Sequence, residues 1–219
     1  MGNTNETRRR RSRKQQKRRK KKYLAMAAVL VLLIFGAVKL FSFLGSLIRG
    51  DKKESEESST SNVISIESDG SLTETSVEDF DTKEYDEEAL RQMADDTIAQ
   101  YNGKEERIIL KTLDIQSGKA RAVIWYKSAE DYAAYNEKVF ETGDVKDLDI
   151  TGVTLADDNN AVLTHDQVSK LKGKYVLLND DTTVAVPKKI LYVSRNVTKT
   201  GKKSADVKKA GIDSVIIYK

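Results

Sequence analysis

The pattern of apolar and polar residues divides the chain into stretches of different character. Residues 23–38 carry no charge, and apolar side chains continue past Lys39 as far as residue 48. A helix over these 26 residues would be about 39 Å long, more than the roughly 30 Å of a bilayer hydrocarbon core. Lys39 lies away from the centre of the stretch, so its ammonium group can reach the far headgroups. The pattern predicts a transmembrane helix over residues 23–48.

The basic residues around this stretch predict its orientation. Residues 1–22 hold 12 Lys and Arg, whereas only Arg49, Lys52 and Lys53 stand just beyond the apolar stretch. Segments rich in Lys and Arg stay on the cytoplasmic side of a membrane. Residues 36–50 contain no pair of small residues at the spacing that cleavage of a signal peptide requires. We therefore expect a cell membrane protein with one uncleaved span, a cytoplasmic N terminus and a C-terminal domain outside.

Residues 1–22 form a basic tail of a kind that attracts phosphate groups. The tail stands directly before the apolar stretch, where each Lys or Arg near an anionic membrane contributes about 1 kcal/mol of attraction. It has no aromatic residue that would stack on bases. The sequence therefore favours two membrane partners, the lipid bilayer for residues 23–48 and anionic lipid headgroups for the tail, over nucleic acid.

Residues 49–84 are rich in Ser, Thr, Glu and Asp, and their apolar residues are scattered singly. Residues 50–102 hold 16 acids against 4 bases. A segment of low hydrophobicity with an excess of like charge buries too little apolar surface to offset the entropy lost on ordering. The composition predicts a disordered acidic stalk over residues 49–84, followed by one domain over residues 85–219.

The domain begins with the spacing of a helix and a hairpin. A helix is predicted from Asp86 to a stop at residues 102–103, because acids fill its first turn and apolar residues recur every three or four positions. Residues 107–115 and 119–126 are rich in β-branched and aromatic side chains. They flank the turn residues 116–118, so they predict a β-hairpin.

The rest of the domain combines one further helix with several short strands. Ser128, with an acid three residues later, is a typical helix N-cap, and this helix is predicted to end at Gly143 with Val139 and Phe140 on its apolar face. Strands are predicted at residues 150–155, 161–163, 175–178, 183–186, 189–194 and 214–218, with a basic connection at residues 198–209. Early helices and late strands indicate an α+β fold, with a mainly antiparallel sheet packed on two to three helices.

Two segments share a pattern in which Asp-Asp stands between short apolar runs. Residues 153–163 and 176–186 align at an offset of 23. Asp favours turns because its side chain bonds to nearby backbone groups, so two hairpins are expected, and a true duplication would give the same pattern. The spacing of neither segment is that of a calcium-binding loop, which favours turn residues over metal ligands. The matched acids are Asp157 with Asp180 and Asp158 with Asp181.

His165 is the only imidazole in the chain and the first candidate for a general base. It follows Thr164, the expected N-cap of a short helix over residues 165–171. No Ser lies in a G-x-S-x-G turn that would make it the nucleophile partner of this His. The sequence therefore favours a surface His over a catalytic one.

Four aromatic residues form the densest aromatic group of the sequence. A strand and the helix that follows it normally bury such residues together, so a core is favoured over a saccharide or peptide groove. Residues 196–198 form a glycosylation sequon. The aromatic group consists of Trp125, Tyr126, Tyr132 and Tyr135.

The chain has no Cys and one His, which excludes a disulfide framework, a thiolate nucleophile and any site with two imidazoles. Glycine-rich loops of the kind that cradle phosphates are also absent. The sequence assigns no catalytic, cofactor-binding or metal-ligating residue, and we expect no cofactor. A domain outside the cell without disulfides suits a bacterial envelope better than a eukaryotic surface.

Three functions remain open at this point. The favoured one is a noncatalytic, membrane-anchored extracytoplasmic module that binds a protein or cell-wall partner. The second is an envelope hydrolase that uses carboxylates, since paired acids can be distant in sequence. The third is a membrane signalling component that acts through its basic cytoplasmic tail.

Overall fold

A computed structural model describes residues 62–83, 85–149, 153–157, 161–168 and 170–219. The basic tail and the apolar stretch at residues 23–48 lie outside the described residues, so their predicted structure stays a prediction. Within the described ranges, no helix has the length and apolar character needed to span a membrane. The described residues form a mixed α+β domain with two mainly antiparallel sheets and a few helices, as the sequence predicts for this region.

The described residues form three α-helices, one short 3-10 helix and twelve strands. The helices are α2 (Glu87–Asn102), α3 (Ala129–Asn136), η1 (Val145–Asp147) and α4 (His165–Val168). The first six strands are β1 (Val63–Ile66), β2 (Leu72–Asp79), β3 (Ile108–Gln116), β4 (Lys119–Tyr126), β5 (Phe140–Asp144) and β6 (Leu155–Ala156). The last six are β7 (Lys174–Leu178), β8 (Thr182–Ala185), β9 (Ile190–Ser194), β10 (Val197–Lys199), β11 (Ser204–Val207) and β12 (Ser214–Tyr218).

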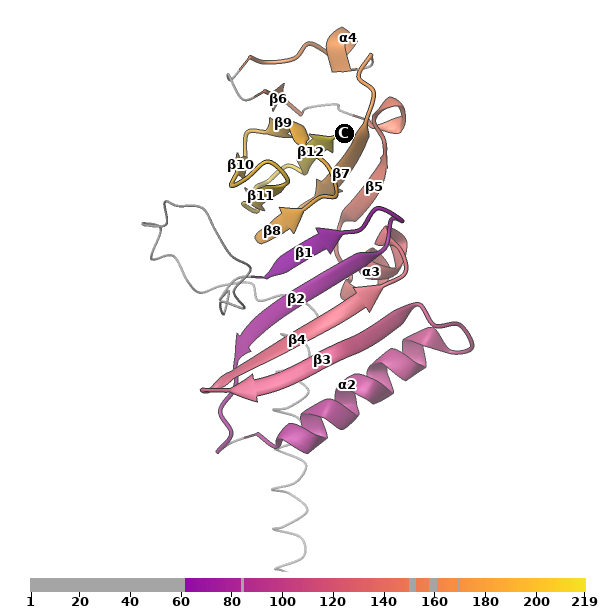
Figure 1. The fold of residues 1–219 in the computed structure, drawn as a ribbon, viewed down its shortest axis with the longest axis vertical. Helices are drawn as coiled ribbons and strands as arrows, with labels where there is room; N and C mark the ends of the chain where they lie inside the picture. The colour runs from indigo at the N-terminus through magenta and orange to yellow at the C-terminus, as the bar shows by residue number, and fades with distance from the viewer. Residues whose placement is uncertain (1–61, 84, 150–152, 158–160, 169) are drawn as a thin grey trace, which may run out of the picture.

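The seven-stranded sheet has the order β10-β11-β8-β1-β2-β4-β3, and the five-stranded sheet has the order β5-β7-β12-β9-β6. All pairs are antiparallel except that of β1 with β8. The small strands from β5 onward gather at one end of the molecule, and α2 lies beside β3 at the other end (Figure 1).

The prediction of a disordered stalk is wrong for its C-terminal part, because β1 and β2 are strands of the larger sheet. β2 lies between β1 and β4 and pairs with both, so its backbone polar groups are satisfied inside the sheet. Leu72, Glu74 and Ser76 alternate inward and are buried. Two of these three inward residues are polar, which is why composition alone suggested disorder. The domain therefore begins at β1 rather than at residue 85.

The first predicted helix and hairpin are confirmed. Asp86 caps α2 by accepting a hydrogen bond from the backbone N–H of Ala89 at 3.1 Å, and Gly103 ends the helix with a positive φ of 58°. β3 and β4 pair along their length around a turn in which Ser117 and Gly118 have φ of 52° and 75°. Two successive positive φ values are the geometry of a type I′ hairpin turn.

The second helix starts where the sequence predicts but ends earlier. Ser128 caps α3 through a hydrogen bond from the backbone N–H of Asp131 at 3.1 Å. Glu137 then adopts the left-handed conformation, with φ of 52° and ψ of 42°, and the chain leaves the helix. Phe140 therefore begins β5, which pairs with β7, and Gly143 lies within that strand. The predicted placement of Val139 and Phe140 on the helix is wrong, because a single left-handed residue breaks the helical repeat.

The two Asp-Asp segments do not form equivalent hairpins. Across the first turn, the Leu163 backbone N–H donates to the Leu155 carbonyl at 2.9 Å. The predicted strands 150–155 and 161–163 are reduced there to β6 and an isolated bridge between Ala156 and Val162, so far as these residues are described. The second segment connects β7 of the small sheet to β8 of the large sheet, and the two strands do not pair. The prediction of a second hairpin is wrong, because β8 pairs with β1, a strand that precedes it by more than 100 residues.

The region predicted as a basic connection contains a further hairpin, β10 with β11. Ala205 and Val207 are buried, whereas the lysines at residues 202–203 and 208–209 are exposed around them. α4 ends at Val168, earlier than the predicted residue 171, and the chain continues as turns.

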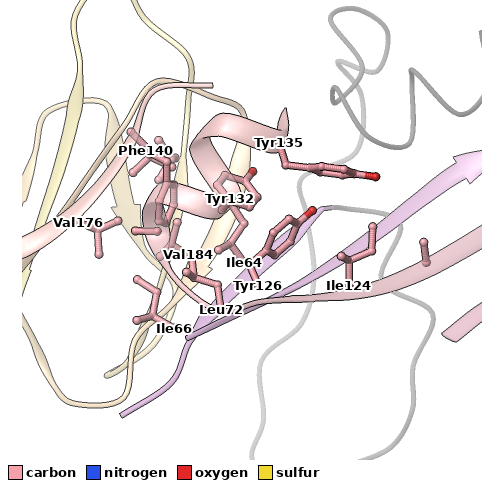
Figure 2. Close-up of a cluster of buried hydrophobic side chains, with 14 of the residues drawn as sticks. Ile64, Ile66, Leu72, Ile124, Tyr126, Tyr132, Tyr135, Phe140, Val176 and Val184 are labelled. Carbon is pink, nitrogen blue, oxygen red and sulfur yellow. The ribbon is translucent and has the colours of Figure 1, made fainter. Parts of the chain in front are cut away.

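A continuous apolar core joins both sheets to α2 and α3. Leu90 and Ile98 of α2, Tyr132 of α3 and Ile216 of β12 all belong to it. Figure 2 shows aromatic rings of this core packed among aliphatic side chains of the surrounding strands. A second, smaller core on the other face of the five-stranded sheet includes Val215 and is closed by side chains such as Val145, Leu155 and Val168. The small sheet is therefore buried on both faces.

Candidate functional site

Asp157 of the first Asp-Asp segment lies at a turn, as predicted. Asp157 accepts a hydrogen bond from the backbone N–H of Ala161 at 2.9 Å, and the backbone N–H of Asp157 donates to the Ala161 carbonyl at 3.2 Å. Asp158 lies outside the described residues. Within the described ranges, no three His, Asp or Glu side chains lie close enough together to hold a metal ion.

Asp180 and Asp181 of the second Asp-Asp segment connect parts of the chain that are distant in sequence. Asp180 forms a 2.6 Å ion pair with Lys138, and the side chains of Asp180 and Lys138 are only 21% and 14% exposed. Asp181 accepts a hydrogen bond from the backbone N–H of Lys209 at 2.9 Å. Asp180 therefore fastens the β7–β8 connection to the segment between α3 and β5, and Asp181 fastens it to the segment after β11.

His165 is the first residue of α4, a helix of four residues that begins after Thr164 as predicted. Asn196 of the sequon lies in the tight turn between β9 and β10. Its side chain accepts a hydrogen bond from Ser194 Oγ at 2.9 Å and donates one to the Lys208 carbonyl at 3.1 Å. The Asn196 amide is thus part of the fold rather than a free acceptor for a glycan.

Three of the four grouped aromatic residues are core residues, as the sequence favours. The Tyr126 and Tyr132 rings are 5.1 Å apart and meet edge to face, and Tyr132 meets Phe140 in the same way at 4.8 Å. Tyr126, Tyr132 and Tyr135 are shown together in Figure 2. Trp125 lies on the opposite face of β4 and is partly exposed, with the ammonium group of Lys111 at 5.7 Å from its ring centroid.

A polar network lies inside this aromatic core, and we call it the sealed cluster. Its centre is Glu74 of β2, which is 3% exposed and accepts a 2.7 Å hydrogen bond from the Tyr126 hydroxyl. Asn136 of α3 donates to the Tyr126 hydroxyl oxygen at 3.2 Å and to the Tyr132 carbonyl at 3.0 Å. The cluster comprises Glu74, Tyr126, Tyr132 and Asn136, with the ion pair of Lys138 and Asp180 beside it.

Burial raises the pKa of Glu74 from 4.5 to about 7, while the hydrogen bond from Tyr126 and the charge of Lys138 lower it in part. Burial also raises the pKa of Tyr126 and of Tyr132 well above the ordinary value of a tyrosine. A carboxyl group with a pKa near neutrality is a frequent mark of acid-base catalysis. Glu74 itself is closed off from solvent, so in this geometry it serves the fold.

A pocket of about 470 Å³ opens elsewhere, at the junction of the two sheets. Its walls come from five segments: residues 66–70 of the β1–β2 turn, 142–144 of β5, 173–174 before and in β7, 187–188 after β8, and 218–219 at the end of β12. This volume is within the range of small-ligand sites. None of the residues of the sealed cluster lines it.

Two glycines shape the pocket by allowing close approach of the chain. A Cβ atom on Gly143 would lie 2.8 Å from Cε1 of the Tyr175 ring, and one on Gly173 would lie 2.7 Å from the Tyr218 carbonyl oxygen. A side chain at position 173 would press on the backbone of β12, and one at position 143 would displace the Tyr175 ring. The walls of the pocket are therefore held by the backbone of β5, β7 and β12.

The charged groups of the pocket are of both signs. Asp69 accepts hydrogen bonds from the Oγ and backbone N–H of Ser71 at 2.7 and 3.0 Å, and these lower the pKa of Asp69. Asp144 lies 3.6 Å from the ammonium group of Lys174. Lys188 also lines the pocket. This lining suits a ligand that carries both amine and carboxylate groups, such as a peptide segment.

Sequence reasoning missed both Glu74 and this pocket. The only signal for Glu74 was the two-residue alternation of residues 72–77, in which the inward positions are polar as well as apolar. The pocket had no local signal, because its walls come from five separate segments.

Comparison with family models, curated proteins and solved structures finds no match for this chain.

Proposed function

We propose that this chain is a noncatalytic, membrane-anchored module of a bacterial envelope, whose outer domain binds an extended peptide segment of a protein or cell-wall partner. The observation that carries the proposal is the pocket beside β5. Residues 142–144 of β5 line the pocket, and β5 is an edge strand of the five-stranded sheet. An edge strand has free backbone N–H and C=O groups on one side, which is how many domains add a peptide as a further strand.

The pocket and the edge supply different parts of such a complex. Main-chain hydrogen bonds to β5 would give affinity that does not depend on sequence, and the pocket would select side chains. The glycine-shaped walls are built from paired strands, so the site is preformed and loses little entropy on binding. The charges of both signs match a peptide with free amine and carboxylate groups. These features favour binding over the hydrolase alternative, because the carboxyl group with the strongly raised pKa, that of Glu74, does not line the pocket.

Site-specific photocrosslinking in a bacterial envelope tests the binding site. A benzophenone side chain at Thr142, in the pocket wall, should form an adduct with one partner. The matched control is Thr198, which lies on β10, an edge strand of the other sheet, and is not in the pocket lining. A band of discrete mass from Thr142 alone indicates a protein partner, and an adduct released by a muramidase indicates a cell-wall partner. Equal adducts at both positions, or none at Thr142, would contradict the proposed site.

The orientation of the anchor is tested separately. A reporter active only outside the cytoplasm should work when fused after Lys219 and fail when fused before Arg8, because 12 Lys and Arg precede the expected span. Replacing Lys39 with Leu should leave this result unchanged. A reporter that works before Arg8 and fails after Lys219 would exclude an outer binding module.

A further inference from the structure

The most basic part of the described domain is the segment from Lys188 to Lys209. It holds eight Lys and Arg and a single acid, Asp206. Asp206 accepts a 2.7 Å hydrogen bond from the Thr183 hydroxyl within the sheet. The segment forms β9, β10, β11 and their turns. Its positive charge is therefore concentrated at the end of the domain where the small strands from β5 onward gather (Figure 1).

The fold brings two of these turns together. The Lys203 carbonyl accepts a 2.8 Å hydrogen bond from the backbone N–H of Val186, and the Lys202 carbonyl accepts one of 2.8 Å from that of Ile190. The β8–β9 turn and the β10–β11 turn therefore lie against each other, although each is local in sequence. We call the four exposed lysines of these turns the lysine cluster, which comprises Lys188, Lys189, Lys202 and Lys203.

The lysine cluster forms no ion pair among the described residues, although one of its members, Lys188, also lines the pocket that contains Asp69 and Asp144. In the described part of the chain, none of its four ammonium groups lies within ion-pair distance of a carboxylate. Four like charges held together on fixed turns repel one another, and a polyanion that bridges them relieves this repulsion. Each lysine that meets an anionic group of a charged polymer also releases condensed counterions from that polymer, which favours binding at low salt.

We infer that the lysine cluster binds a polyanion with repeating phosphate groups, as a second contact of the domain with its surroundings. The inference deepens the proposed function, since it rests on the domain facing the cell wall. Lysine ammonium groups are point charges that suit phosphate without demanding one geometry. Exposed lysines on two adjoining turns therefore fit a flexible chain of phosphates.

The start of the described chain and the lysine cluster lie at opposite ends of β8. The Asn62 carbonyl, where the described chain begins, accepts hydrogen bonds from the backbone N–H of Thr183 and the Thr182 hydroxyl at the start of β8. The lysine cluster flanks the other end of this four-residue strand, about 10 Å further on.

Binding of polyphosphate by the full chain in neutral detergent micelles tests this inference. All samples share a background in which the 12 basic residues of the tail are replaced by Gln, so that the tail does not contribute. The cluster variant combines Lys188→Glu, Lys189→Glu, Lys202→Glu and Lys203→Glu. The control has the same net charge and combines Lys83→Glu, Lys104→Glu, Lys127→Glu and Lys146→Glu, which are exposed elsewhere.

The cluster variant should bind polyphosphate at least tenfold more weakly than the parent, and the control less than threefold more weakly. Loss of four phosphate contacts should also reduce the slope of log affinity against log salt by about 3. Equal losses in both variants would show general electrostatic attraction and overturn the inference. A cluster-specific loss for phosphatidylglycerol vesicles but not for polyphosphate would overturn it in favour of a membrane surface. Crosslinking at Thr142 reports on the proposed peptide site independently of either result.

Discussion

The sealed cluster and the lysine cluster show two opposite uses of charge in one small domain. Glu74 lies in the core with its carboxylate bonded to Tyr126, and burial raises its pKa to about 7. The lysines of the second cluster are exposed and have no carboxylate at ion-pair distance in the described chain. A buried charge destabilises the fold unless hydrogen-bond or ion-pair partners compensate its loss of hydration. An exposed charge without an ion-pair partner is available to a ligand. The sealed cluster therefore serves the fold, and the lysine cluster is the part that we propose binds a ligand.

Removing β1 and β2 should have the largest effect, because the sealed cluster is built on β2. Residues 62–219 should melt in one cooperative transition, and residues 85–219 should show none, since the truncation exposes a long edge of β4 and deletes Leu72 and Glu74 from the core. Calorimetry of the two fragments provides the measurement. A cooperative melt of residues 85–219 would show that β1 and β2 are dispensable.

Replacing Glu74 with Gln should change how stability depends on pH. The folded pKa of about 7 exceeds the ordinary 4.5, so the folded state holds this proton more tightly than the unfolded state. The stability linked to Glu74 is therefore full below pH 4.5 and is lost as the pH rises through 7. Gln stays neutral, so the variant should exceed the parent by about 3 kcal/mol at pH 8 relative to the difference at pH 4. Urea titrations at the two pH values measure this, and parallel profiles would refute a buried, titrating Glu74.

The two Asp-Asp segments offer a smaller test at the border of the sealed cluster. Asp180→Asn removes the ion pair with Lys138, a side chain that is 14% exposed, and should destabilise the domain by about 1 to 3 kcal/mol. Asp157→Asn keeps an oxygen that accepts from the backbone N–H of Ala161, so its effect should stay below about 0.5 kcal/mol. Equal effects in thermal melts would mean that the two turns are equivalent after all.

These segments also show what sequence could and could not predict. α2, the β3–β4 hairpin and the start of α3 follow from local signals: a cap, a repeat or a turn pair. β2 was missed because polar residues, Glu74 and Ser76, occupy its inward positions. The hydrogen-bond partner of Glu74 is Tyr126, which is distant in sequence. The second hairpin was predicted wrongly because the partner of β8 is β1, a choice that no turn residue encodes. The pocket and the lysine cluster depend on such long-range pairing.

The comparison is tested most directly by measuring stability and polyphosphate affinity on the same two variants at pH 8, in the full chain with the neutral tail. Relative to its effect at pH 4, Glu74→Gln should raise the free energy of unfolding at pH 8 by about 3 kcal/mol, and it should leave the affinity within twofold of the parent. The fourfold lysine variant should lose at least tenfold in affinity, with its free energy of unfolding within about 1 kcal/mol of the parent. A loss of affinity in Glu74→Gln, or unchanged affinity in the lysine variant, would contradict the division of folding and binding between the two clusters.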